Sequence, residues 1–162
     1  MTYMDKRNKL FLFDIDHTMI DITKVHLKAY KKAYFDVLGK KVSSKVFEKN
    51  FGKASDQFHS SIFKEINSKF DKEKVNQIRK IWEKEIIIYL KNNKIKILPG
   101  VIEFLNYLKK EKYLLGVVTG NNKKIGTLIL KKANLLKFFK IKGFSDKAKN
   151  RTEIVNKAIK SA

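Results

Sequence analysis

Two carboxylates, Asp14 and Asp16, follow directly after a short apolar run from Leu10 to Phe13. A strand that runs out into a loop needs only one polar residue at its end, so the second acid is the informative one. Two carboxylates held close together can act as a nucleophile and as a general acid or base. The pair predicts a reactive site at the end of the first strand, although Asp is also a common turn former there.

A hydroxyl and an amide follow a second apolar run, at Thr119, Gly120 and Asn121. In an open parallel sheet, ligands bind at the carboxyl ends of the strands, so we expect these residues to lie near Asp14. Such a set suits phosphoryl transfer, in which the first acid attacks while the hydroxyl and backbone N–H groups hold phosphate oxygens. The alternative role of Thr119 is to cap the following helix.

The elements that must position these residues follow from the spacing of apolar side chains. Residues Lys9 to Phe13 lack polar alternation and predict a strand buried on both faces. Helical spacing then predicts three helices, over Lys24–Leu38, Ser55–Phe70 and Asp71–Leu90. After a turn at Pro99 and Gly100, strands alternate with helices, which indicates a parallel sheet. The predicted order there is a helix over Val101–Leu108, a strand over Tyr113–Val118, a helix over Lys123–Ala133, a strand within Phe138–Phe144, and a helix from Thr152.

Length and composition restrict the class of protein. A chain of 162 residues suits one domain, or a core with one sizeable insertion. The longest apolar runs, such as Ile86 to Leu90, are far shorter than the roughly 18 residues that a membrane helix needs. The N-terminus lacks the apolar stretch of a secretory signal, and the absence of cysteine excludes disulfides and thiolate metal sites, so we expect a cytoplasmic protein.

The formal net charge of +21 raises the question of nucleic-acid binding. The positive residues are nearly all lysines, spread from Lys6 to Lys160, and the arginines are Arg7, Arg79 and Arg151. This spread favours a solvated surface of biased composition. A nucleic-acid binder stays open as a less favoured alternative, and it would need its lysines on one face and a steep dependence of affinity on salt.

The motifs Asp14-Ile15-Asp16-His17-Thr18 and Val117-Val118-Thr119-Gly120-Asn121 resemble those of the haloacid dehalogenase superfamily of phosphohydrolases. That family carries DxDxT after its first strand and a Thr or Ser at the end of a second. The LPG at Leu98–Gly100 is similar to the phosphoglycolate phosphatase-like branch. The resemblance implies a Rossmann-like α/β core, formed by residues 1–19 and 98–162, with an inserted α-helical cap at residues 20–97.

The resemblance also implies roles for the site residues. Asp14 would attack phosphorus and form an aspartyl phosphate, while Asp16 would protonate the leaving oxygen and later activate water. The implied phosphate-binding residues are Thr18, Thr119, Gly120 and Asn121. Arg151 is the best match to the cationic residue of the site, with Lys147 and Lys149 as rivals. The presence of an acid at position 16 argues for a leaving group that needs a proton.

The sequence departs from the family pattern at its end. The family has a further strand that ends in a Gly-Asp pair and helps to hold Mg²⁺, but this sequence stops before it, at Ala162. Only the Asp14 carboxylate and the Asp16 backbone carbonyl would remain as metal ligands, with Asp146 a weak substitute, so we expect poor Mg²⁺ affinity. We expect a truncated product or a fragment, weakly active or inactive, whose exposed first strand can pair with another chain.

The histidines and the loop after Gly52 are harder to assign. His17 stands where the family most often has Gly, which predicts a variation of the turn rather than a substrate contact. His26 and His59 lie in predicted cap helices, where we expect partly exposed structural roles. Lys53, Ser55 and Gln57 are expected in an exposed loop, with contact to the site as the alternative.

The function that this pattern predicts is a magnesium-dependent phosphatase acting on a small phosphorylated metabolite. Three alternatives stay open: a sugar phosphomutase, a phosphate-binding module without turnover, and the nucleic-acid binder. The residues do not separate hydrolase from mutase.

Overall fold

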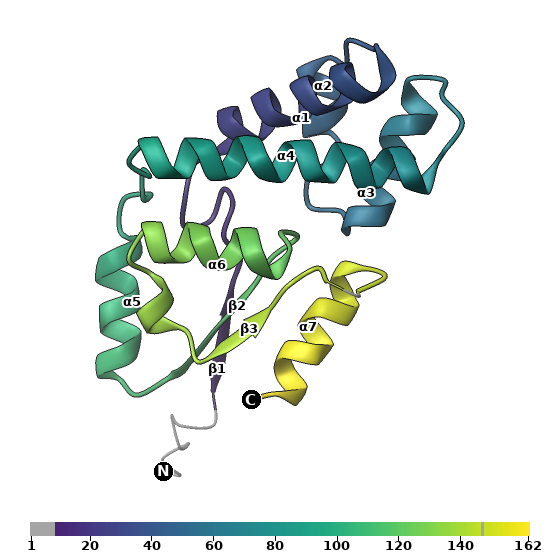
Figure 1. The fold of residues 1–162 in the computed structure, drawn as a ribbon. Helices are drawn as coiled ribbons and strands as arrows, with labels where there is room; N and C mark the ends of the chain where they lie inside the picture. The colour runs from purple at the N-terminus through teal and green to yellow at the C-terminus, as the bar shows by residue number, and fades with distance from the viewer. Residues whose placement is uncertain (1–8, 147) are drawn as a thin grey trace.

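The structure is a computed structural model, and it describes residues 9–146 and 148–162 of the 162-residue chain. A group of helices lies above a parallel sheet that is flanked by further helices (Figure 1). The upper group comprises α1 (Thr23–Leu38), α2 (Ser44–Glu48), α3 (Ser55–Glu65) and α4 (Lys72–Asn92). The predicted α/β fold class is confirmed.

The sheet has three parallel strands in the order β1 (Leu10–Phe13), β2 (Leu114–Val118) and β3 (Ile141–Gly143). Phe13 pairs with Val117, and Val118 pairs with Gly143. This register brings the residues that follow β1 and β2 to the same edge of the sheet. Among the described residues β1 pairs with β2 alone, so its other edge is open.

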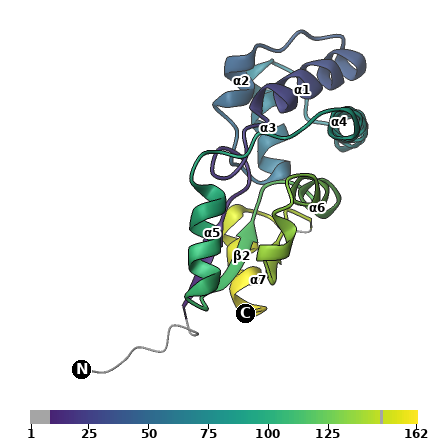
Figure 2. The ribbon, with the colours of Figure 1, turned by 90° about the vertical axis from the view of Figure 1, so that its left-hand side faces the viewer.

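Side chains alternate between the two faces of the sheet, as the pleat of a strand requires. Phe11, Phe13, Leu115 and Val117 belong to the large core that includes α5 (Val101–Lys110) and α6 (Lys123–Lys132). The intervening residues Leu10, Leu12, Leu114 and Val118 pack in a smaller cluster with α7 (Arg151–Lys160). Figure 2 shows the strand β2 between α5 and α7.

Two of the upper helices have clear local signals at one end, α4 at its start and α1 at its end. The side chain of Asp71 accepts hydrogen bonds from the backbone N–H groups of Glu73 and Lys74 and so caps α4. Gly39 ends α1 with a φ of 65°, a left-handed conformation that glycine adopts without a Cβ penalty.

No helix in the described part of the chain is long and apolar enough to cross a bilayer.

The elements differ from the sequence predictions in three places. The helix predicted over Ser55–Phe70 ends at Glu65, and Asn67 then adopts a φ of 50°. The short helix α2 was not predicted. In the run Phe138–Phe144 only Ile141–Gly143 forms a strand, because Leu136–Phe138 form a 3-10 turn, η2, whose apolar side chains fill the core instead.

Candidate active site

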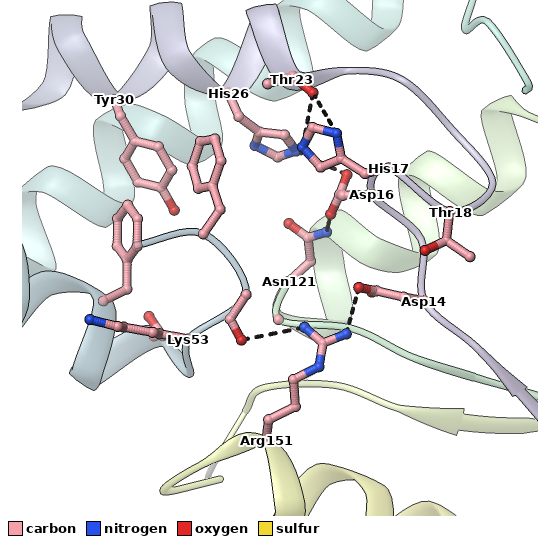
Figure 3. A pocket seen from close by; sticks show the side chains of 15 residues that line it. Asp14, Asp16, His17, Thr18, Thr23, His26, Tyr30, Lys53, Asn121 and Arg151 are labelled. Carbon is pink, nitrogen blue, oxygen red and sulfur yellow. Dashed lines mark hydrogen bonds and ion pairs between the residues drawn. The ribbon is translucent and has the colours of Figure 1, made fainter. Parts of the chain in front are cut away.

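A cavity of about 360 Å³ lies between the upper helices and the carboxyl ends of β1 and β2 (Figure 3). From the sheet side it is lined by Asp14, Asp16, Thr18, Gly120, Asn121 and Arg151. The helical side contributes His26, Tyr30, Phe51, Gly52, Lys53, Ser55 and Phe58. The two predicted strand ends therefore share one cavity.

Asp14 lies directly after β1 and is fixed by two contacts. Its Oδ1 accepts a hydrogen bond of 2.8 Å from the backbone N–H of Ile15, and its Oδ2 lies 2.5 Å from Nη2 of Arg151. Burial raises the pKa of the Asp14 carboxyl, and the charge and hydrogen bond of the Arg151 guanidinium offset only part of that effect. The ion pair nevertheless holds a carboxylate oxygen at the floor of the cavity.

Asp16 makes contacts of a different kind with its two carboxylate oxygens. Asn121 donates a hydrogen bond of 2.6 Å from Nδ2 to Oδ2 of Asp16, and Nε2 of His26 lies 3.4 Å from Oδ1 (Figure 3). Burial disfavours the charged form of Asp16, but the charge and hydrogen bonding of His26 and the Asn121 amide more than offset it. The pKa of Asp16 is therefore held below its ordinary value, whereas that of Asp14 is raised.

His26 is 7% exposed, so the expectation of a partly exposed structural residue is wrong. Its ring stacks on Trp82 of α4, with 5.6 Å between ring centroids. Trp82 also stacks on Tyr30, one turn further along α1, at 5.3 Å. The stack fixes the plane of the imidazole and directs Nε2 at Asp16.

Thr119 does not line the cavity and lies almost wholly buried. Its Oγ1 accepts hydrogen bonds of 3.1 Å from both the backbone N–H and the side-chain Nδ2 of Asn121. The hydroxyl thus orients the amide that contacts Asp16. The neighbouring Gly120 and the more distant Thr18 do line the cavity.

Among the three candidate cations, Arg151 is the one that lies at Asp14. It is the first residue of α7, and its Nη1 also donates a hydrogen bond of 3.4 Å to the backbone carbonyl of Gly52 in the upper part of the molecule. Lys149 lines a neighbouring cavity instead, and Lys147 lies outside the described residues. One guanidinium therefore joins the end of β1 to the loop before α3.

The turn between the two motif acids and α1 depends on His17. Its φ is 60°, a left-handed conformation that is unfavourable for residues with a Cβ, which gives a physical reason for Gly at this place in the family. The ring of His17 lies against the Thr23 hydroxyl, with Nε2 3.0 Å from Oγ1.

His59 is 1% exposed and contacts the Tyr34 hydroxyl, so the expectation that it is partly exposed is also wrong.

The described residues do not bring three or more metal-binding side chains together at any point. Asp146, the proposed substitute ligand, accepts a hydrogen bond of 2.5 Å from the backbone N–H of Lys123 at the start of α6. The Asp16 carboxylate faces His26 and Asn121, which leaves Asp14 as the candidate carboxylate ligand. The side chains described here do not supply the oxygen set that Mg²⁺ prefers.

Sequence reasoning missed the aromatic part of the site. Tyr30, Phe51 and Phe58 line the cavity, and Tyr30 stacks against Trp82. Helical spacing identified Tyr30 and Phe58 only as core residues, because an apolar residue over a cavity has the same pattern as one in a core. Phe51 lies between the predicted helices and was not singled out. Lys53 and Ser55 also line the cavity, in agreement with the alternative considered for that loop, whereas Gln57 is not among its lining residues.

Comparison with known proteins identifies the family. Residues 11–162 match the family model described as haloacid dehalogenase-like hydrolase. A search of curated protein sequences finds no significant match. Solved structures with a similar fold include a predicted phosphoglycolate phosphatase from Haemophilus somnus 129PT, a hydrolase from Pseudomonas syringae, and CbbY from Rhodobacter sphaeroides in complex with phosphate.

The likeness to these structures lies in the fold, because sequence identity is 19%, 19% and 14%, respectively. The TM-scores are 0.71, 0.82 and 0.78. The aligned region covers 90%, 94% and 94% of this chain, but 66%, 69% and 71% of the other chains. The chain thus spans about two thirds of the length of these structures. Because the family model matches nearly the whole sequence, the chain belongs to the haloacid dehalogenase-like hydrolase family.

Proposed function

We propose that the chain carries the chemistry of a phosphatase that hydrolyses a small phosphate monoester through an aspartyl-phosphate intermediate. The observation that carries this proposal is the pairing of Asp14 Oδ2 with Arg151 at 2.5 Å, beside an Asp16 carboxyl that is positioned by Asn121 and His26. Family membership and the phosphate bound to CbbY, a structure of similar fold, support phosphate as the reacting group.

In the first proposed step, a carboxylate oxygen of Asp14 attacks phosphorus. The bond from phosphorus to the leaving oxygen breaks, and that oxygen takes a proton from Asp16. Because its pKa is lowered, Asp16 is ionised in the free protein and must take up this proton before the step. His26, whose Nε2 lies 3.4 Å from Oδ1 of Asp16, is the nearest group that can exchange the proton with it. Arg151 offsets the charge that develops on the phosphoryl oxygens.

In the second step, Asp16 takes a proton from water, and the resulting hydroxide attacks phosphorus. The bond between phosphorus and the Asp14 oxygen breaks, which releases inorganic phosphate and restores the carboxylate. We propose that α1–α4, within residues 20–97, act as a cap that excludes water and contacts the leaving group. The contacts of Gly52, Lys53 and Ser55 with the cavity support this role.

Magnesium is the cation that the sequence resemblance implies. It prefers six oxygen ligands, often two or fewer carboxylates together with substrate phosphate and water. Among the described residues the Asp14 carboxylate is already paired with Arg151, and the Asp16 carboxylate is turned toward His26 and Asn121. These residues do not form a magnesium site on their own, and no step above depends on the metal.

We also propose that the open edge of β1 pairs with a second copy of the chain. The strand carries Leu10, Phe11, Leu12 and Phe13, all only partly buried, and its outer backbone groups have no partner strand among the described residues. An apolar strand edge of this kind favours pairing between chains.

Hydrolysis of generic and sugar phosphates by the chain, with and without Mg²⁺, tests the proposed function. Asp14→Asn should lower phosphate release by about a thousandfold or more, because an amide cannot form the acyl phosphate. Asp36→Asn, on the exposed part of α1, is the matched control and should retain activity. Equal activity in the Asp14→Asn protein would refute the proposed nucleophile. Phosphate binding without any turnover would instead favour a binding module.

A further inference from the structure

A second cavity, of about 450 Å³, lies between the upper helices and the loops that follow β2 and β3. It shares Tyr30, Ser55 and Gly120 with the cavity that contains Asp14. The two cavities therefore adjoin, so a substrate whose phosphate lies at Asp14 can direct its other end toward the second cavity. The proposed reaction uses none of the side chains that are particular to this second cavity.

Arg79 of α4 contributes an incompletely used guanidinium to this cavity. Its Nη2 pairs with the Asp56 carboxylate, while its Nε is enclosed and has no hydrogen-bond partner among the described residues. The Asp56 side chain is 78% exposed, so it can turn into solvent at little cost. An incoming carboxylate or phosphate could then accept hydrogen bonds from Nε and Nη2 together, the bidentate geometry that guanidinium groups favour.

Trp82, one turn further along α4, offers a second donor. Its side chain lines the cavity and is 5% exposed, and its indole N–H has no acceptor within the described chain. The indole cannot easily turn away, because it stacks on both His26 and Tyr30. Leaving a buried donor unpaired costs about 1–3 kcal/mol, so an acceptor supplied by a ligand recovers that free energy.

The side of the cavity opposite Arg79 and Trp82 adds a positive charge. Its carboxylate is already hydrogen-bonded and does not compete with an anionic ligand. Lys149 lines it from the loop that precedes α7. Asp146 also lines the cavity, but it accepts a hydrogen bond from the N–H of Lys123 at the positive end of α6. The two acids of this cavity are thus both engaged, and the unpaired polar atoms of its cap side are N–H donors.

We propose that this second cavity is a specificity subsite for an anionic group, a carboxylate or a second phosphate, carried by the substrate away from its reacting phosphate. Arg79 and Trp82 bind that group, and Asp56 occupies the guanidinium until the group arrives. The assignment rests on the proposed phosphatase function, because it places the ester phosphate at Asp14.

Matched pairs of ligands test the subsite. Phosphoglycerate is compared with glycerol phosphate, which has a hydroxymethyl group in place of the carboxylate, and fructose bisphosphate is compared with fructose phosphate. Trp82 is the only tryptophan of the sequence, so its fluorescence reports binding directly, with calorimetry as the second method. At least one doubly anionic member should bind about tenfold or more tightly than its partner. The member that does so shows whether the subsite takes a carboxylate or a phosphate.

Three variants then assign the preference to named atoms. Arg79→Lys keeps the positive charge but loses the two parallel N–H groups of the guanidinium. Trp82→Phe keeps a stacked ring but loses the indole N–H. Each should lower the ratio of affinities within a ligand pair severalfold or more. Asp56→Asn removes the competing carboxylate and should raise the ratio. Lys80→Gln, on the exposed neighbouring residue, is the control and should leave the ratio unchanged.

The possible failures are distinct. Equal affinity within both ligand pairs, or a ratio that Arg79→Lys does not change, would overturn the subsite. If Trp82→Phe does not fold, the affinity ratio measured with Arg79→Lys decides whether the subsite exists. Loss of the proposed function appears separately, as phosphate release from glycerol phosphate that Asp14→Asn does not reduce.

Discussion

Nε2 of His26 lies 3.4 Å from Oδ1 of Asp16, and neither atom has a hydrogen-bond partner elsewhere among the described residues. The histidine comes from α1 and the aspartate from the turn after β1, so the contact links the helical layer to the sheet. It helps to keep the Asp16 carboxylate charged in a buried position, because burial alone raises the pKa of a carboxyl.

His26→Asn should shift the pH dependence of activity. Without the imidazole, burial raises the pKa of Asp16 with less opposition, so a higher pH is needed to keep Asp16 ionised as the base of the second step. The acid limb of the kcat profile should therefore move to higher pH. Rates measured from about pH 4 to pH 8 check this shift. An unchanged acid limb would mean that His26 does not act on Asp16.

Arg151→Met should reduce kcat by about a hundredfold or more, because the cation at Asp14 and at the phosphoryl oxygens is lost. Arg151→Lys retains the charge but cannot contact both Asp14 and the Gly52 carbonyl with one planar group, so an intermediate loss is expected. Lys160→Met, near the exposed end of α7, should leave kcat unchanged. Full activity in Arg151→Met, with activity lost in Lys149→Met, would assign the role to Lys149.

His59 should make the protein less stable as the pH falls. Burial, with a smaller contribution from the Arg79 charge, lowers its pKa to about 3, whereas an unfolded histidine has a pKa near 6.5. Between these values the unfolded state binds the additional proton, so the free energy of unfolding decreases by about 1.4 kcal/mol for each pH unit below about 6.5. This contribution is fully present at higher pH and is lost progressively toward pH 3.

Urea denaturation at several pH values measures this slope. His59→Gln cannot titrate, so its stability should depend less on pH between about 6.5 and 4.5, although the loss of the Tyr34 contact changes its absolute value. The His26→Asn and His59→Gln proteins serve as controls for each other. His59→Gln should leave the acid limb of kcat in place, and equal stability slopes in wild type and His59→Gln would contradict the assignment.

Magnesium should bind weakly to the chain alone. A carboxylate that is already paired with Arg151, together with the backbone carbonyl of Asp16, is a poor ligand set for a cation that prefers six oxygens. Calorimetric titration should show no saturation below about 1 mM Mg²⁺, and Asp14→Asn should remove what binding there is. Micromolar affinity that survives in Asp14→Asn would point to ligands away from this cavity.

Self-association through β1 should depend on concentration. Sedimentation velocity over a wide range of protein concentration should show dimers increasing with concentration. Backbone amides of residues 10–13 that face away from β2 should become protected from hydrogen exchange as dimers form. A monomer at every concentration would contradict pairing at this edge.

The site residues at the strand ends could be predicted from the sequence, because a polar residue that directly follows an apolar run marks the end of a strand. Asp14 and Gly120 follow apolar runs, and the parallel arrangement of β1 and β2 brings them into one cavity. The choice of Arg151 over Lys149 depends on a finer feature, the residue at which α7 begins. Asn150 caps that helix, so Arg151 lies on its first turn while Lys149 precedes it.

The contacts between α1 and the sheet could not be predicted from sequence patterns. His26, Tyr30 and Trp82 have the spacing of ordinary core residues, and no local rule states how α1 and α4 sit over the strand ends. The second cavity has the same origin, because its walls come from segments far apart in the sequence. Helical periodicity identifies a buried face but does not identify what that face covers.

The alternation of β1 across its two faces makes this short strand sensitive to changes in length rather than in composition. Phe11 and Phe13 face the large core while Leu10 and Leu12 face α7, and Asp14 follows in the same alternation. Exchanging one apolar residue for another alters packing locally. Inserting or deleting a single residue between Leu10 and Phe13 would reverse the faces for the residues on one side of the change. Either the side chains at the start of the strand would lose their packing or Asp14 would turn away from Arg151, so natural variants of this segment should differ by substitution and keep its length.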